Sequence, residues 1–224
     1  MAGGRRIGLA FVAAALVCAG SAAAAGTWPK HEKNAADQAL AAKSILHLSD
    51  FTPGTGWKVA HDGGDSGGTM DDPACKGAQF SDVGRVLTGS ASSTFEAPGL
   101  QVWSSADVMK TLAMARTDVG KMTRAAIVPC LAAVIRNNLP KTVRLRSVDA
   151  LSFPRVGDWT SAYRVVIDVT VSSTTVRMQL DVVLVQHDRV EITLMQMAPS
   201  SISSLAKAGE LRMAQRLAGP SLSA

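Results

Sequence analysis

Three consecutive stretches in the second half of the chain alternate apolar and other side chains with a period of two, and no other feature constrains the fold as strongly. The apolar positions are Tyr163, Val165, Ile167, Val169 and Val171, then Val176, Met178, Leu180, Val182 and Leu184, and finally Val190, Ile192 and Leu194. Because residues two apart in a strand point to the same face, each stretch predicts a β-strand. Short connections separate the stretches, so together they predict an antiparallel meander with one fully apolar face.

The register of this meander should keep the apolar sets on one face. The first turn, at residues 173–174, is expected to contain two residues. At the second turn, a three-residue loop at 187–189 places Leu184 opposite Ile192, whereas a two-residue loop would place Leu184 opposite Glu191. We therefore predict the three-residue loop.

Helices and further strands are expected on both sides of the meander. Apolar spacing predicts strands over residues 85–95, 100–103 and 143–151, and helices over 35–48, from 104 to the interruption at Gly120, from 122 to 137, and over 200–217. Ser104 and Asp107 form the capping box that should start the second helix, and Pro129 should kink or restart the third. The fold class predicted is α+β, a single domain with helices packed on an antiparallel sheet.

Residues 1–25 have the form of a secretory signal peptide, with arginines at 5 and 6, an apolar segment over 7–18 and small residues before a cleavage point after Ala25. The alternative is an uncleaved membrane anchor, because the apolar stretch 7–25 is barely long enough to span a bilayer. The protein is therefore expected to be secreted or held in the cell envelope, with membrane contact only through this segment before cleavage.

The rest of the chain divides into a loose segment over 26–34, one domain over 35–219 and a tail over 220–224. With 47% hydrophobic and 18% charged residues, it has the composition of a globular protein. The formal charge of +5 includes the two arginines of the signal segment. That small excess gives no reason to expect a nucleic-acid partner.

Beyond Cys18, which lies in the signal segment, the chain has two cysteines, Cys75 and Cys130. An even count in an exported protein predicts that they form a disulfide, and two free thiols are the alternative. Zinc ligands are usually more closely spaced, so a metal site is disfavoured. Lipid attachment at Cys18 is also disfavoured, because Val17 precedes it where a small residue is required.

Apparent catalytic motifs do not predict an enzyme. Residues 64–68 spell the Gly-Asp-Ser-Gly-Gly sequence of chymotrypsin-like proteases, but too little chain precedes Ser66 to supply the partner residues of that family. The aspartates of the same region lack the spacing of a calcium loop, and the four histidines form no ligand motif. No catalytic residue, cofactor or metal ligand is therefore predicted.

The second face of the predicted meander is less polar than an open surface would be. We consider it a candidate ligand groove, in which charged side chains flank an apolar strip: Arg164, Val166, Arg177, Val183, Val185 and Met195. The alternative is that helices cover this face and its charges pair across the strands.

Several short motifs follow an order known from one protein family. A helix leads into Leu-Ser-Asp-Phe-Thr-Pro-Gly-Thr-Gly-Trp at 48–57, and Asp-Pro-Ala-Cys follows at 72–75. Ala-Ser-Ser-Thr-Phe at 91–95 precedes a strand, a long helix and Cys130, and Val-Gly-Asp at 156–158 introduces the hairpins. The chain resembles the extracytoplasmic sensor-type domains of actinobacterial lipoproteins and secreted proteins. It is similar to the extracellular sensor domain of mycobacterial receptor serine/threonine kinases.

The resemblance implies an α+β fold, a family disulfide at Cys75 and Cys130, and a non-enzymatic role in binding an undefined ligand outside the membrane. Two departures limit it: Cys18 does not lie in a lipobox, and no kinase domain is present in these 224 residues. We expect a binding or sensor-like protein of the cell envelope, whose partner is a small amphiphilic or anionic ligand or an envelope protein. The alternatives are a small secreted hydrolase and a structural envelope protein.

Overall fold

The computed structural model describes residues 29–60, 84–122 and 127–219, and these form the predicted α+β domain. The strands are β1 (Lys30–His31), β2 (Lys58–Val59), β3 (Val86–Ala97), β4 (Leu100–Met109), β5 (Val143–Ala150), β6 (Trp159–Val171), β7 (Thr174–His187) and β8 (Val190–Pro199). The helices are α2 (Ala35–Lys43), α3 (Leu112–Met122), α4 (Ile127–Asn138) and α5 (Ser203–Leu217). No helix in these described ranges has the length and hydropathy needed to cross a membrane.

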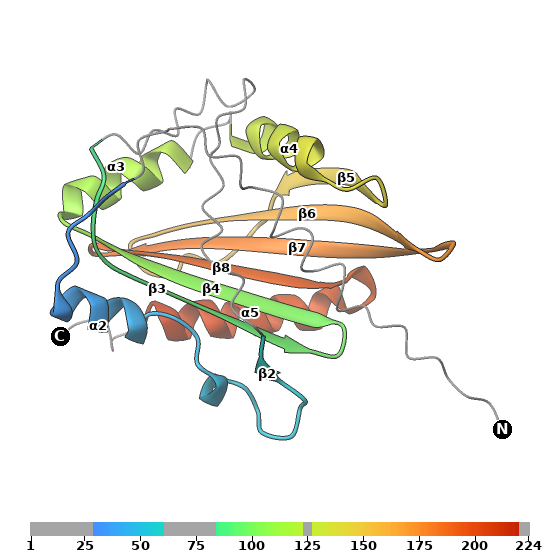
Figure 1. Ribbon diagram of the computed structural model, residues 1–224, viewed down its shortest axis with the longest axis horizontal. Coiled ribbons are helices and arrows are strands. Elements are labelled where there is room, and N and C mark those ends of the chain that lie inside the picture. Colours follow the sequence, from blue (N-terminus) through green and yellow to red (C-terminus); the bar gives the residue numbers. More distant parts are fainter. Residues whose placement is uncertain (1–28, 61–83, 123–126, 220–224) are drawn as a thin grey trace.

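The strands form one eight-stranded sheet in the order β1-β3-β4-β8-β7-β6-β5, with β2 also paired to β3 (Figure 1). All pairs are antiparallel except β1 with β3. Strands β6 to β8 form the predicted meander, and β5 pairs with β6 as a further antiparallel strand. Strand β8 continues the sheet by pairing with β4 of the β3–β4 hairpin. Lys30 and His31 thus join the sheet, although their segment was expected to be loose.

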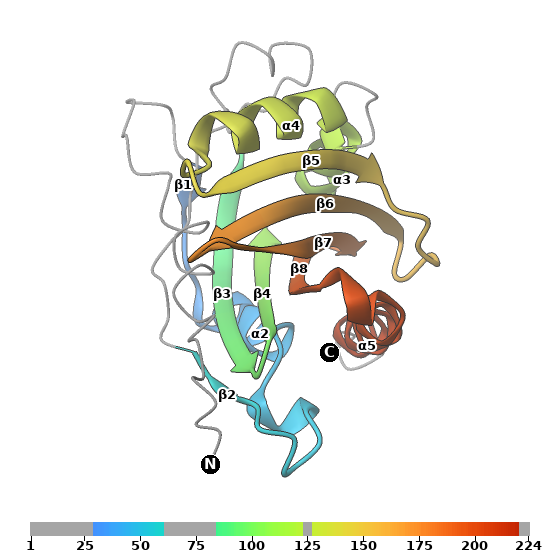
Figure 2. The ribbon, with the colours of Figure 1, turned by 90° about the vertical axis from the view of Figure 1, so that its right-hand side faces the viewer.

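Helices cover both faces of the sheet (Figure 2). We call the side under α2 and α5 the α5 face; its core includes Val102, Val183, Ile192 and Leu194, all 2% exposed or less. We call the other side, under α3 and α4, the α4 face; Val165, Ile167 and Met178 pack there against apolar residues of α4. Members of both sets of alternating side chains in the meander are therefore buried.

This two-sided burial changes the predicted register. The β6–β7 turn is Ser172 and Ser173, both with positive φ, one residue earlier than predicted. The β7–β8 turn has two residues, not the predicted three, because His187 pairs with Val190. Ile192 and Leu194 consequently lie opposite Val185 and Val183 on the α5 face, not beside Val165, Ile167 and Leu180 as predicted. The prediction failed because it assumed that only one face needed apolar residues.

The predicted helix start at Ser104 is also wrong, because β4 continues to Met109 with alternate residues buried. The Ser104 hydroxyl accepts a hydrogen bond from the Leu46 amide at 2.9 Å, so it does not cap a helix. Helix α3 begins only after Thr111, whose hydroxyl accepts from the Met114 amide at 3.2 Å. Pro129 lies in the first turn of α4, where its missing N–H breaks no helical hydrogen bond.

One ion pair ties α2 to the centre of the sheet. Asp37 accepts hydrogen bonds from Arg189 at 2.8 and 3.1 Å and from the Thr88 hydroxyl at 2.5 Å. Arg189 also donates to the backbone oxygen of Met109 at 2.8 Å. Helix α2 can lie this close to β3 because Gly89 has no side chain; a Cβ at this position would be 2.2 Å from the backbone oxygen of Asp37. The Arg189 bonds hold the pKa of Asp37 well below its usual range.

Replacing Asp37 should therefore destabilise the whole domain. We expect Asp37→Asn to lower the free energy of unfolding by about 2–3 kcal/mol at pH 7, because Arg189 loses its charged partner in a largely buried setting. Urea denaturation of Asp37→Asn, Arg189→Gln and the double variant should give a coupling energy of about 1 kcal/mol or more. The exposed Asp149→Asn is the matched control. Additive single-variant effects would contradict the proposed role of the pair.

Candidate functional site

The structure does not assemble the six residues of the predicted groove into one surface. All but Met195 lie on the α5 face, where Val183 and Val185 are 0% and 2% exposed beneath α2 and α5. Met195 pairs with Val182 and lies on the opposite face. The covering helices were the alternative considered from the sequence, and they occupy the space that a ligand would need.

The two arginines of that groove pair with aspartates, as the same alternative expected. Arg164 donates to both carboxylate oxygens of Asp181, at 2.6 and 2.5 Å, and Asp181 is fully buried. Arg177 donates to Asp168 at 3.0 Å near the β6–β7 turn. Val166 is half-buried on the same face. These charged side chains link neighbouring strands of the sheet and are already paired.

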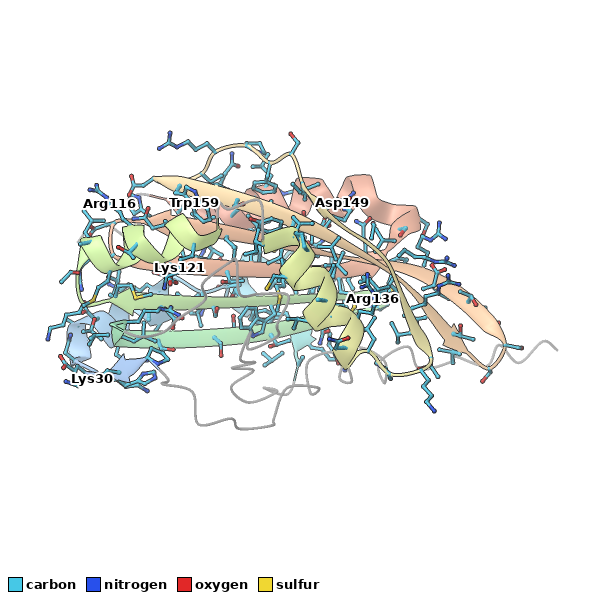
Figure 3. All side chains as sticks on the ribbon, turned by 90° about the horizontal axis from the view of Figure 1, so that it is seen from above. Lys30, Arg116, Lys121, Arg136, Asp149 and Trp159 are labelled. Carbon is cyan, nitrogen blue, oxygen red and sulfur yellow. The ribbon has the colours of Figure 1, made fainter. Side chains whose placement is uncertain are left out.

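A solvent-open cavity of about 510 Å³ lies at one end of the α4 face, beside α3. Its lining comes from three parts of the chain: Arg116, Val119 and Gly120 of α3, Arg155, Asp158 and Trp159 around the start of β6, and Gln186 of β7. Figure 3 shows Arg116 and Trp159 close together at this end of the sheet. The volume is within the range of small-molecule sites.

The wall of the cavity before β6 is held in place by hydrogen bonds. The amide of Asp158 donates to the Gln186 oxygen at 2.8 Å, and one Asp158 carboxylate oxygen accepts from the Asp188 amide at 2.7 Å. The Thr160 hydroxyl accepts from the Val156 amide at 2.8 Å. Gly157 has φ +69, and a Cβ there would be 2.7 Å from the Gln186 oxygen. Glycine is therefore required where this segment meets β7.

A buried acidic cluster lies on the other side of α3. Glu191 of β8 is opposite Asp107 in the sheet and close to Asp118 of α3. Burial raises the pKa of Glu191 to about 9, and the negative charge of Asp118 adds to the shift. Arg85 opposes it, with its guanidinium 3.7 Å from Glu191 and 3.4 Å from Asp118. Lys121 of α3 also contacts Asp118, at 3.2 Å.

A second cavity, of about 390 Å³, opens beside this cluster and is lined by Gly84, Arg85, Thr111, Ala113, Met114, Thr117, Asp118 and Lys121. Helix α3 thus forms a wall of both cavities. The cationic side chains that line the second cavity, Arg85 and Lys121, already contact Asp118 or Glu191. The larger cavity is therefore the better candidate for a ligand.

The described residues that line the larger cavity include no serine, threonine, cysteine or histidine, and Asp158 is the one side chain among them that could act as a nucleophile or a base. His187 lies nearby, but its Nδ1 is 3.7 Å from the Asp158 carboxylate, which is too long for a hydrogen bond. Within the described ranges, no group of three or more metal-ligating side chains forms a metal site.

Sequence reasoning missed this site, although one signal pointed to it. Val156, Gly157 and Asp158 were recognised as a motif before the hairpins, and they form the segment beside the cavity. Arg116 and Gly120 belong to a separate helix, and Gln186 comes from a third element. Only the folded sheet brings them together.

Of the two cysteines in the predicted disulfide, the structure describes only Cys130. Cys130 lies in α4 and is fully buried. Cys75 lies outside the described residues, as do residues 1–25, Ser66 and its neighbours, and the tail at 220–224. The pairing of Cys75 with Cys130 therefore stays a prediction.

No model of a known protein family matches the chain, and no curated protein matches its sequence. Similar solved structures include the extracellular domain of PknH from Mycobacterium tuberculosis, with 12% identity, a TM-score of 0.41, and coverage of 80% of this chain and 96% of that one. An uncharacterized protein from Mycobacterium smegmatis has 12% identity, a TM-score of 0.39, and coverage of 76% and 93%.

LpqN, involved in cell envelope biogenesis of Mycobacterium tuberculosis, has 9% identity, a TM-score of 0.30, and coverage of 71% of this chain and 75% of that one. All three proteins are mycobacterial. Likeness this low carries no argument about the function of this chain.

The buried position of Val183 leads to a test of the original groove. We expect Val183→Asp to unfold the domain, because it places a charge in the core beneath α2 and α5. Far-ultraviolet circular dichroism and thermal melting will measure this, with Val59→Asp, the same change at a valine that is 61% exposed, as the control. A folded Val183→Asp protein that had lost ligand binding would restore the groove hypothesis.

The raised pKa of Glu191 leads to a pH-dependent prediction. Between about pH 4.5 and 9, Glu191 is protonated in the folded chain and ionised in the unfolded chain, so its contribution to stability falls as pH rises. Relative to Glu191→Gln, the wild type should lose up to about 1.4 kcal/mol of unfolding free energy per pH unit across this window.

Urea denaturation at pH 5, 7 and 9 will measure that difference. Glu32→Gln is the control, because Lys110 and Lys30 lower the pKa of this exposed carboxyl to about 2. Its substitution should not change the slope between pH 5 and 9. Parallel pH profiles for Glu191→Gln and the wild type would show that Glu191 is ionised in the folded protein.

Proposed function

We propose that this chain is a non-enzymatic ligand-binding domain exported to the cell envelope, and that its ligand occupies the cavity beside α3. The observation that carries the proposal is the cavity itself, where two arginines and a tryptophan from separate elements line one space. The signal-peptide pattern of residues 1–25 supports the location.

The geometry favours a preformed binding site. The segment around Asp158 is bonded to β7 and to the β7–β8 turn, so it need not be ordered when a ligand arrives. A wall held in this way lowers the entropy cost of binding. The hydrolase alternative would require a nucleophile beside a base, and among the described lining residues only Asp158 could take either role.

A structural envelope protein is the other alternative, and it predicts no ligand. Gly120 offers a direct test, because it lines the cavity and a Cβ added there meets no atom within 4 Å. We expect Gly120→Trp to fill the cavity while leaving the fold intact, since replacing glycine inside a helix does not lower helix propensity. Gly120→Ala is the matched control that leaves the cavity open.

Native mass spectrometry of protein purified from its own host will report a bound ligand as added mass. The wild type and Gly120→Ala should carry that mass, and Gly120→Trp should not. Circular dichroism will verify that all three proteins are folded. Absence of added mass from the wild type, or its retention in Gly120→Trp, would overturn the proposal that the cavity is the binding site.

A further inference from the structure

Two arginines line the larger cavity without a carboxylate partner among the described residues. Arg116 is exposed on α3 and makes no ion pair there, and Arg155 donates only to the backbone oxygen of Asp158. Arg189, by contrast, is held by two bonds to Asp37. Guanidinium groups bind carboxylate and phosphate oxygens through paired hydrogen bonds. The cavity therefore has the charge and donors for an oxyanion.

The acidic side chain in the lining does not cancel this charge. Asp158 is the only carboxylate among the described lining residues, set against two guanidinium groups. One oxygen of that carboxylate already accepts from the Asp188 amide at 2.7 Å. The described lining residues therefore carry a net positive charge, which attracts anions into the cavity.

Trp159 adds a flat apolar surface to the same lining, close to Arg116 (Figure 3). An indole packs well against the C–H groups of a ring. Among the described lining residues, Val119 is the one other apolar side chain. They offer little area for a long acyl chain, which gains its affinity from each buried CH₂. Asp158 and the Gln186 carboxamide instead offer polar atoms that suit hydroxyl groups.

We infer that the ligand of this cavity is an anionic sugar, with its carboxylate or phosphate bound by Arg116 and Arg155 and its ring packed on Trp159. The inference rests on the function proposed above and adds the chemical class of the ligand. It assigns the charge to the arginines, the ring to the indole and the hydroxyl groups to Asp158 and Gln186.

Isothermal titration calorimetry with four probes tests this assignment: glucuronate, glucose 6-phosphate, neutral glucose and inorganic phosphate. At least one anionic sugar should bind tenfold more tightly than glucose, and the comparison of glucuronate with glucose 6-phosphate distinguishes a carboxylate from a phosphate ligand. Inorganic phosphate should bind more weakly than the preferred anionic sugar, because it has no ring to pack on Trp159.

Variants assign each part of the ligand to a side chain. Arg116→Gln and Arg155→Gln should each weaken the anionic sugar about tenfold and leave glucose unchanged. Trp159→Ala should weaken the sugars but not inorganic phosphate. Arg144→Gln, at an exposed position of β5, is the control for loss of one positive charge and should have no effect.

Two outcomes would overturn the inference: glucose binding as tightly as both anionic sugars, or undiminished binding of the anionic sugar by both arginine variants. If no sugar binds but the wild type carries a mass that Gly120→Trp lacks, the sugar inference fails and the proposed function stands. If no probe binds and no such mass is present, both fail.

Discussion

The register of β7 and β8 at the turn formed by Asp188 and Arg189 is the constraint on which the rest of the structure depends. It sets Val183 and Val185 against Leu194 and Ile192, which completes the apolar core under α2 and α5. The turn residues then act at a distance in sequence. Arg189 binds Asp37 and the Met109 backbone, and the Asp188 amide binds Asp158 beside the cavity. A shift of one residue here would lose the core alignment and both connections.

The two faces of the sheet have different tasks as a result. The α5 face is closely packed and includes a buried ion pair between Arg164 and Asp181, so its charges serve the sheet. The α4 face is covered at its two ends by different helices (Figure 3). Val182, Leu184 and Met195 on this face are only half-buried. A cavity can therefore exist beside α3 without disrupting the main core.

Helix α3 connects the cavity with the buried acids. Arg116 and Gly120 line the cavity, whereas Asp118 and Lys121 belong to the cluster around Glu191. In the described part of the chain, α3 contributes Ala115 and Met114 to a small apolar cluster with Leu87 of β3 and Met109 of β4. When Glu191 is protonated, no second buried negative charge lies beside Asp118. The neutral form of Glu191 therefore stabilises the packing of α3 on the sheet. The raised pKa of Glu191 thus follows from the packing of α3, which buries Glu191 and brings Asp118 close to it.

The sequence by itself determined the fold class, the meander and the approximate positions of most helices, because periodicity records which side chains must avoid water. It could not determine the register, because two pairings place apolar residues opposite each other. Pairing Leu184 with Ile192 suits a sheet with one covered face, and the observed pairing of Val183 with Leu194 suits a sheet with two. The strand through Ser104 was missed because its hydroxyl bonds Leu46, a partner 58 residues away. Likewise, Arg116, Trp159 and Gln186 share no motif, and only tertiary structure brings their three elements around one cavity.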